Sequence, residues 1–295
     1  MSYISFFKNQ FIPTDEISLN FSDNFLTIVR GYQVFTFFKT AYGGKPLFLD
    51  HHIDRLLSNA ESMQMIVEQS HEDIKQLVME TLDKNDCTNK EFNVMVILSG
   101  GKPDDSSALS SKNAVNISVI VTLIKVFPPE SYTKGIALGL FEYQRAHGEL
   151  KGSFSYVGAT LAQNIVVRDS DYDEALYTSN NMVLEGTTFS FFAINHDGTV
   201  LTSNADGRIL RSVTRLVLLD IMQRESISFE EKNLSLDEVY QCKEAFIVSS
   251  HRDIIPVISV DNHTIGDGLV GESTKKLMEL YQKEVLELVS NRNNV

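Results

Sequence analysis

The sequence predicts a two-domain protein of mixed α/β (α+β) class. At 295 residues the chain is long enough to bury more than one hydrophobic core. Short apolar runs typical of strands alternate with segments whose apolar residues recur at helical spacing. Residues 125–134 interrupt this pattern with two adjacent prolines among polar residues, as an interdomain linker would. We therefore expect an α+β domain over residues 1–122, a linker over 123–134 and a larger domain over 135–295.

The predicted N-terminal domain combines strands with two helices. From Asp50 to Met63, apolar residues recur every three to four positions behind an aspartate that can cap a helix. A second helix is expected over about 70–83. The turn-forming residues 42–46 lie between two apolar runs and indicate a hairpin. The expected strands span 4–7, 34–38, 47–49, 92–98 and 115–124.

The predicted C-terminal domain alternates short strands with helices. Helical periodicity places helices over about 155–168, 209–224 and 273–289, and a short helix begins at 236. The remaining apolar runs have the length of buried strands. They span 136–141, 174–178, 182–185, 190–194, 200–202, 245–249 and 257–260.

Composition disfavours several classes of partner. The net charge of −13 argues against nucleic acid and anionic membranes as partners. Cys87 and Cys242 are far apart and lack metal-ligand spacing, so we expect reduced thiols, no disulfide and no metal site. The N-terminus lacks a signal-peptide pattern, and no run of 18 apolar residues could span a membrane. We expect a soluble, cytoplasmic protein.

One stretch carries residue types that suit a pyridoxal phosphate (PLP) site. It begins at Lys151, continues through Tyr156 and ends with Glu185. A lysine amine condenses with an aldehyde to form a Schiff base. A carboxylate against a pyridine nitrogen keeps that nitrogen protonated, so the ring draws electrons from a substrate's α-carbon. Taken alone, these residues fit a solvated lysine and a strand-end carboxylate better than a cofactor site. The rest of the chain favours the cofactor.

Several short blocks follow one another in a characteristic order. They are Gly31–Phe35 (GYQVF), Asp50–Leu56 (DHHIDRL), Arg145 with Lys151 and Tyr156, Asp173–Tyr177 (DEALY), Val183–Thr187 (VLEGT), Leu210–Arg215 (LRSVTR), Phe246–Val257 and Gly266–Gly268. Each block is unspecific by itself. Together they make residues 31–276 resemble the class IV (fold type IV) PLP-dependent enzymes, which include branched-chain aminotransferases, D-amino-acid transaminases and aminodeoxychorismate lyases. The resemblance implies the D-amino-acid-aminotransferase-like fold, with the cofactor in the interdomain cleft, and a homodimer.

The resemblance also implies roles for individual residues. Lys151 would form the Schiff base and, once freed by substrate, would move a proton between the α-carbon and the cofactor. Glu185 would bind the pyridinium nitrogen, and Tyr156 would donate to the cofactor's phenolic oxygen. Tyr156 at a helix start would equally fit plain packing.

The cofactor's phosphate requires several oriented donors. The backbone N–H groups of Val213 and Thr214, near the start of the expected 209–224 helix, would supply two of them. Arg55 would add a bidentate, charge-assisted contact, and Ser250 a hydroxyl. A solvated arginine and a turn serine are the ordinary alternatives for these two positions.

Three positions depart from the family pattern. Ser212 stands where the family usually has glycine before the phosphate-binding pair. Ser190 stands where it usually has asparagine, and Thr36 where an acidic residue is familiar. None of these positions is a principal cofactor contact, but they leave the subfamily open.

The substrate and the reaction are less constrained. D-amino-acid transaminases of this family hold the substrate carboxylate with an Arg-x-His pair, and the corresponding loop, residues 100–107, contains neither arginine nor histidine. Lys102, Arg145 and His251 remain candidate cations for that role, and Phe35 is a candidate substrate contact.

We expect an aminotransferase that acts on an amino acid and a 2-oxo acid. One alternative is an aminodeoxychorismate lyase, because lyases of this family also place threonine after the aromatic residue of the first block, as in Phe35–Thr36. A lyase would eliminate pyruvate and release 4-aminobenzoate. The other alternative is a non-catalytic protein that retains the fold.

Overall fold

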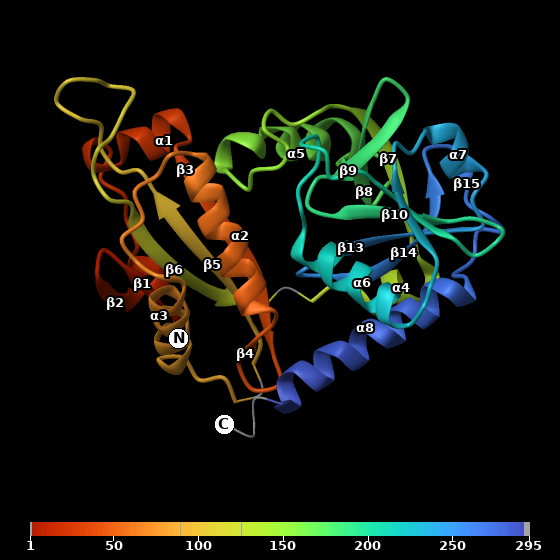
Figure 1. Ribbon diagram of the computed structural model, residues 1–295, viewed down its shortest axis with the longest axis horizontal. Helices are drawn as coiled ribbons and strands as arrows, with labels where there is room; N and C mark the ends of the chain where they lie inside the picture. Colours follow the sequence, from red (N-terminus) through yellow and green to blue (C-terminus); the bar gives the residue numbers. More distant parts are fainter. Residues whose placement is uncertain (1, 89, 125, 292–295) are drawn as a thin grey trace. The chain divides into compact units, whose positions relative to one another are not determined.

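The computed structural model describes residues 2–88, 90–124 and 126–291, coloured along the sequence in Figure 1. The chain divides into two compact units. Unit 1 comprises Met1–Lys125, Leu150–Phe154 and Leu288–Val295, and unit 2 comprises Val126–Glu149 and Ser155–Glu287. The division differs from the expected one because the short segment that carries Lys151 groups with unit 1. Lys125, in the expected linker, lies outside the described residues.

Unit 1 is built on an antiparallel six-stranded sheet in the order β2-β1-β6-β5-β3-β4. Buried and partly buried residues alternate along the long strand β3, and most residues of β5 and half of those of β6 are buried. This burial matches the apolar sequences of the three strands. The strands are β1 Ile4–Phe7, β2 Gln10–Pro13, β3 Gln33–Ala41, β4 Lys45–Pro46, β5 Phe92–Ser99 and β6 Asn116–Leu123.

Two helices, α2 (Leu49–Ser62) and α3 (His71–Asp83), pack on this sheet (Figure 1). Ile53 and Leu56 from α2 are fully buried in one core cluster with Phe38 of β3. A capping box begins α3, in which Ser70 and Asp73 exchange side-chain and backbone hydrogen bonds. The short segments are η1 Thr14–Glu16, η2 Ser22–Asn24 and α1 Phe25–Arg30.

Unit 2 is built on a mixed nine-stranded sheet in the order β12-β11-β10-β13-β14-β7-β8-β9, with β15 paired to β14. The parallel pairs are β14–β7, β7–β8 and β11–β12, and the other ladders are antiparallel. The strands are β7 Ile136–Glu142, β8 Glu174–Ser179, β9 Met182–Gly186, β10 Ser190–Ile194, β11 Val200–Ser203, β12 Phe229–Lys232, β13 Glu244–Ser249, β14 Asp253–Val260 and β15 His263–Thr264.

The helices of unit 2 refine the sequence expectations at two places. The expected linker contains α4, Pro129–Lys134, because Pro129 occupies the first helical position, where proline is well tolerated. The helix expected from about 209 begins at Val213, since Ser212 is its N-cap. The other helical segments are η3 Ser153–Ser155, α5 Val157–Ala162, a π-helical turn Gln163–Val167, α6 Val213–Arg224, α7 Leu236–Tyr240 and α8 Glu272–Asn291, whose last residues belong to unit 1.

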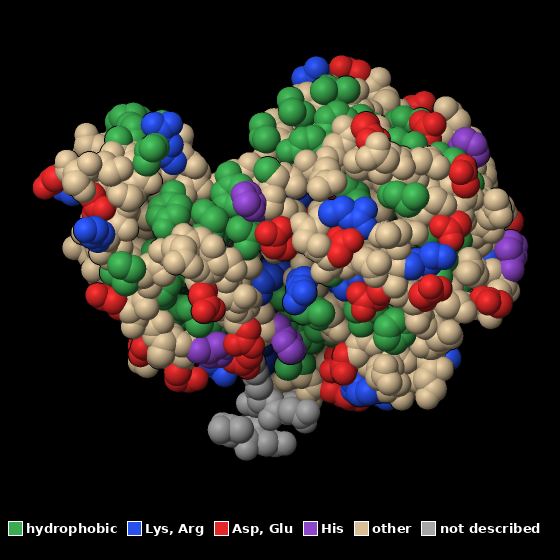
Figure 2. Space-filling view, turned by 45° about the horizontal axis from the view of Figure 1, so that its top comes forward, with side chains coloured by type: hydrophobic (Ala, Val, Ile, Leu, Met, Phe, Trp, Pro, Cys, Tyr) green, Lys and Arg blue, Asp and Glu red, His purple; other side chains and the backbone are tan. Residues whose placement is uncertain are grey.

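Acidic and basic side chains are interspersed over the face that Figure 2 shows. No helix among the described residues is long and apolar enough to cross a membrane. Within residues 2–88, 90–124 and 126–291, no group of three or more His, Cys, Asp or Glu side chains could hold a metal ion. Cys87 and Cys242 are both free thiols.

Candidate active site

The backbone of Lys151 is fixed from two sides within unit 1. Its N–H donates to the side-chain oxygen of Asn59, on α2, at 2.8 Å. Its carbonyl accepts from the N–H of Phe35, on β3, at 2.9 Å, and the next residue, Gly152, forms a β-bridge with Val34. The segment that carries the lysine is therefore joined to β3 by one β-bridge and one backbone hydrogen bond. Its position depends on the first sheet of the chain.

The side chain of Lys151 is partly buried beside an aromatic ring. Its Nζ atom lies 5.0 Å from the ring centroid of Phe35, within the range of a cation–π contact. The predicted tether and the predicted substrate contact are thus neighbours. This arrangement limits the directions in which the amine can point.

Arg55 belongs to a buried polar group that joins α2 to β3. Its Nη2 donates to Thr36 Oγ1 at 3.0 Å, and Thr36 Oγ1 lies 2.8 Å from Nδ1 of His52. Burial lowers the pKa of His52 well below its ordinary value of 6.5, and the positive charges of Arg55, Lys151 and His51 lower it further. His52 is therefore neutral at physiological pH.

Unit 2 contributes a buried carboxylate at the end of β9. Both side-chain oxygens of Glu185 accept from the N–H of Leu210, at 3.2 and 3.3 Å, and the carboxylate forms an ion pair with Nη2 of Arg145. Burial alone would lower the pKa of the Arg145 guanidinium. The neighbouring Glu185 and Tyr156 outweigh burial, so the pKa of Arg145 is raised. The arginine is charged at any pH at which the protein folds.

Tyr156 completes this cluster from the N-cap position of α5. The guanidinium carbon of Arg145 lies 5.1 Å from the centroid of the Tyr156 ring. Tyr177, on β8, packs nearby, and burial raises the pKa of its phenol above the ordinary value of 10. Arg145 thus contacts two residues predicted from the 151–188 stretch, Tyr156 and Glu185, within unit 2.

A second group in unit 2 has the features of an anion site. Val213 and Thr214 are the first residues of α6, where backbone N–H groups lack intrahelical partners. The Thr214 hydroxyl lies 3.3 Å from the hydroxyl of Ser250 at the end of β13. The helix dipole favours negative charge at this end. Ser212 accepts from the N–H of Arg215 at 3.4 Å and so replaces the expected glycine as a cap.

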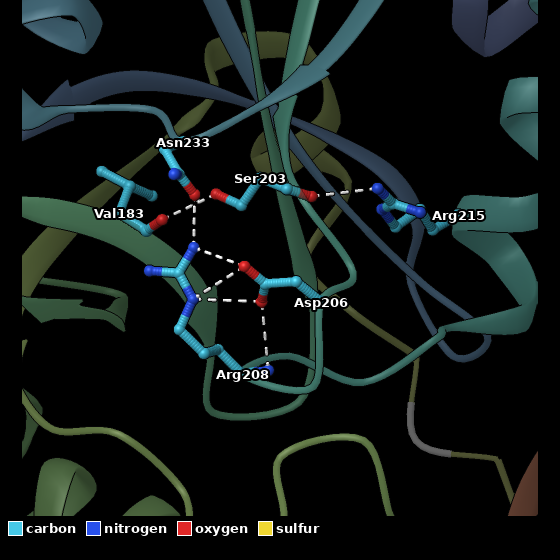
Figure 3. Close-up of polar contacts among 6 residues, drawn as sticks. All are labelled: Val183, Ser203, Asp206, Arg208, Arg215 and Asn233. Carbon is cyan, nitrogen blue, oxygen red and sulfur yellow. Dashed lines mark hydrogen bonds and ion pairs between the residues drawn. The ribbon is translucent and has the colours of Figure 1, made fainter.

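The loop that leads from β11 into α6 is fastened by the contacts drawn in Figure 3. Arg215 is buried and donates to the carbonyl of Ser203 at 3.0 Å, while the Ser203 hydroxyl donates to the carbonyl of Val183 at 2.6 Å. Arg208 binds Asp206 through two nitrogens, at 2.7 to 3.1 Å, and also contacts Asn233. These contacts fix the start of α6 relative to β9, which carries Glu185.

Of the three candidate cations for the substrate carboxylate, Lys102 lies apart from these groups, whereas His251 and Arg145 adjoin or belong to them. Lys102 is exposed and lines a surface pocket of unit 1 together with Lys8. His251 directly follows Ser250 and packs edge-on against Phe127, with ring centroids 5.2 Å apart. Arg145, proposed as a substrate cation, has its charge matched by Glu185.

Sequence reasoning missed two positioning residues of unit 1. Asn59 lies four residues after Arg55, on the apolar side of α2, and a polar residue there was a detectable signal. His52 is part of the Asp50–Leu56 block, but its hydrogen bond with Thr36 can be recognised only once it is known how α2 packs on β3.

The residues of the two units fit PLP as separate halves. Unit 1 offers an amine and a guanidinium, and unit 2 offers a buried carboxylate, a phenol and a hydroxyl-lined helix start. Nε and Nη1 of Arg145 are buried and have no hydrogen-bond partner among the described residues, so two donors of this cluster are left for a bound group. A charged pyridine ring and a phosphate are both chemically matched by this donor and acceptor set.

Comparison with known proteins identifies similar chains over nearly the whole length. A family model described as amino-transferase class IV matches residues 33–260. A probable branched-chain-amino-acid aminotransferase of Aquifex aeolicus is 25% identical over 94% of this chain and 90% of its own length. A D-alanine aminotransferase of Staphylococcus haemolyticus is also 25% identical, over 95% of this chain and 97% of its own.

Solved structures share the fold. The branched-chain aminotransferase of Thermoproteus uzoniensis with norvaline has a TM-score of 0.86 at 21% identity, over 97% of this chain and 96% of that one. The PLP form of the enzyme from Thermobaculum terrenum has a TM-score of 0.84 at 20% identity, over 96% and 94%. The expected two-domain α/β fold is confirmed by these similarities.

Proposed function

Because the chain belongs to the class IV aminotransferase family, we propose that it transfers an amino group between an amino acid and a 2-oxo acid, with PLP held by Lys151. The observation that carries this assignment is the buried Glu185 carboxylate, held by the Leu210 N–H and compensated by Arg145. Bound PLP would supply an electron-withdrawing ring that stabilises negative charge at the substrate's α-carbon.

The chain's own residues would divide the remaining work. The Lys151 amine would hold the cofactor covalently and, once released, would accept and return the α-proton of the substrate. Glu185 would accept the hydrogen bond of the protonated ring nitrogen, and Tyr156 would bind the phenolic oxygen. The N–H groups of Val213 and Thr214 would bind the phosphate.

Three further side chains complete the proposed cofactor and substrate contacts. Ser250, within hydrogen-bonding distance of Thr214, would donate its hydroxyl to the phosphate, and Arg55 would add its charge. We also propose that His251 contacts the substrate, because it directly follows Ser250, whose hydroxyl would bind the phosphate. We propose that Arg145 holds Glu185 in place and does not bind the substrate, because the ion pair with Glu185 already compensates its charge.

The relatives leave the choice of amino donor open. Those compared above include one named for branched-chain amino acids and one for D-alanine. We propose that the amino donor is an amino acid with a small or aliphatic side chain. A panel of L- and D-amino acids, each added to the PLP-loaded protein, should bleach the visible absorbance of the bound cofactor only for donors.

The attachment of the cofactor can be tested independently of turnover. Borohydride reduction followed by peptide mass analysis should place the cofactor on Lys151, and the Lys151→Ala protein should carry none. The matched control is Lys134→Ala, at the exposed end of α4, which should behave as the wild type. Attachment to another lysine, or a panel in which no amino acid bleaches the band, would contradict the proposal. Release of 4-aminobenzoate from aminodeoxychorismate would assign the lyase reaction instead.

We also propose that the active protein is a homodimer. Val157, Leu161 and Ile165 follow one another at four-residue spacing along α5 and the π-helical turn, and their exposed fractions are 57, 43 and 69%. Large apolar side chains in such a row favour a protein partner. Ile165→Glu should shift sedimentation from dimer to monomer, whereas Leu286→Glu, also an exposed apolar position but on α8, should not. A wild-type protein that sediments as a monomer would contradict the dimer.

A further inference from the structure

Thr36, His52 and Arg55 form a closed polar triangle inside unit 1. Thr36 lies on β3 with none of its surface exposed, and His52 and Arg55 lie one turn apart on α2. The three contacts are Thr36 Oγ1 to His52 Nδ1 at 2.8 Å, Arg55 Nη2 to Thr36 Oγ1 at 3.0 Å and Arg55 Nη2 to His52 Nδ1 at 3.5 Å. The imidazole also packs against Phe38, with ring centroids 5.2 Å apart.

The chemistry of the three groups fixes the direction of each hydrogen bond. A guanidinium has no acceptor atom, so Nη2 of Arg55 donates to the Thr36 oxygen. Nδ1 of His52 faces the same Nη2, and a proton on Nδ1 would point at a cation. A lone pair on Nδ1 is therefore favoured, and the Thr36 hydroxyl donates to it. His52 then carries its only ring proton on Nε2.

We propose that Thr36 and His52 are positioning residues that orient the Arg55 guanidinium toward the phosphate of the cofactor through the directed chain Arg55 to Thr36 to His52. This inference rests on the function proposed above. Of these three residues, Thr36 alone both accepts a hydrogen bond, from Arg55, and donates one, to His52. It therefore connects the charged guanidinium to the neutral imidazole. A long arginine side chain held at one nitrogen loses less freedom when it binds an anion at the others.

The choice of threonine has a second effect on Arg55. A hydroxyl satisfies one guanidinium N–H without adding charge, whereas a carboxylate at this position would compensate the arginine within the protein. His52 also adds no charge, since burial and the nearby cations keep it neutral. Thr36 and His52 therefore hold Arg55 without adding a negative charge beside it.

The decisive experiment compares two ligands that differ only in the phosphate. Pyridoxal 5′-phosphate and pyridoxal are titrated into apo protein of the wild type, Thr36→Val and Thr36→Ser. Valine keeps the shape of threonine and removes the hydroxyl, so PLP affinity should fall about tenfold, the scale of one lost hydrogen bond to a charged group. Pyridoxal affinity should not change, and Thr36→Ser should bind PLP as the wild type does.

Each other result overturns the inference. If Thr36→Val binds PLP as tightly as the wild type, Thr36 does not orient Arg55. If pyridoxal binding falls as much as PLP binding, the substitution acts through the fold, which melting curves of the variants would register. A wild type that binds neither ligand would refute the proposed function.

Nitrogen-15 spectra of the apo protein test the proton direction without any ligand. The His52 ring, assigned by its loss in His52→Asn, should show an unprotonated Nδ1 and a protonated Nε2 at neutral pH. A protonated Nδ1 would refute the directed chain, whatever the cofactor titrations show.

Discussion

Arg145 and Glu185 form an ion pair with both side chains almost completely shielded from water, at 2 and 4% exposure. Removing two charges from water is costly, and a buried pair stabilises a fold less than apolar packing of the same volume would. The pair is therefore better explained by function than by stability. Arg145 compensates the charge of the carboxylate that we propose binds the protonated ring nitrogen.

Removing only one member of this pair should be strongly destabilising. Arg145→Met leaves Glu185 as a lone buried carboxylate, and we expect a loss of about 3–5 kcal/mol in the free energy of unfolding. Urea denaturation measures it. The double variant Arg145→Met with Glu185→Gln should recover part of the loss, because no uncompensated charge then remains. A double variant as unstable as the sum of the two single variants would show that the residues are not coupled.

Glu185→Gln should separate cofactor binding from catalysis. The amide oxygen can still accept from the Leu210 N–H, so we expect the fold and PLP occupancy to persist. A neutral amide does not hold a ring nitrogen in its protonated form, and kcat should fall by about 10²-fold or more. Single-turnover absorbance measurements check this, with the occupancy determined by released PLP. Unchanged kcat would remove Glu185 from the catalytic group.

Asn59 should influence Lys151 through the backbone alone. Asn59→Ala removes the acceptor of the Lys151 N–H, which should cost about 1–3 kcal/mol of stability and lower activity by misplacing the amine. Asn59→Asp keeps an acceptor oxygen and serves as the matched variant. Calorimetry and steady-state rates of both proteins test this. Equal losses in the two variants would mean that the volume and polarity of the site matter rather than this hydrogen bond.

Stability should fall as the pH drops below about 6.5 because of His52. Its pKa in the folded protein is lowered, first by burial and then by Arg55, Lys151 and His51, whereas the unfolded chain has the ordinary value of 6.5. Below that pH the unfolded state binds a proton that the folded state does not, so stability is lost until the pH passes the folded pKa. Denaturation between pH 7.5 and 5 should show a shallower decline for His52→Asn than for the wild type. The exposed His196→Asn variant should follow the wild type.

The sequence was sufficient for the family, the cofactor type and most elements. The helices α2 and α3 and the strands β5 and β6 were predictable because the spacing of their apolar residues is a local property of the sequence. The start of α6 was placed about four residues early, because Ile209 and Leu210 continue the apolar period. Leu210 instead donates its N–H to Glu185, a tertiary contact that periodicity does not encode.

The sequence indicated which residues belong to the candidate site, but it did not indicate which of them contact one another. Lys151 was assigned to the large domain because its neighbours in sequence are there, yet its backbone hydrogen bonds go to Asn59 and Phe35. Arg145 was considered a substrate cation because the 100–107 loop lacks the Arg-x-His pair that holds the substrate carboxylate in D-amino-acid transaminases. Its partner, 40 positions further along the chain, is a residue of the same site.

The return of Leu150–Phe154 to the first sheet has a practical consequence for dissecting this protein. A fragment that stops at residue 124 would lack the segment that bridges to β3, and a fragment that starts at 126 would carry that segment without β3. Neither half is therefore suited to separate expression or to exchange between homologues. Chimaeras should instead be joined at surface turns inside one unit, such as the Asn195–Thr199 turn between β10 and β11.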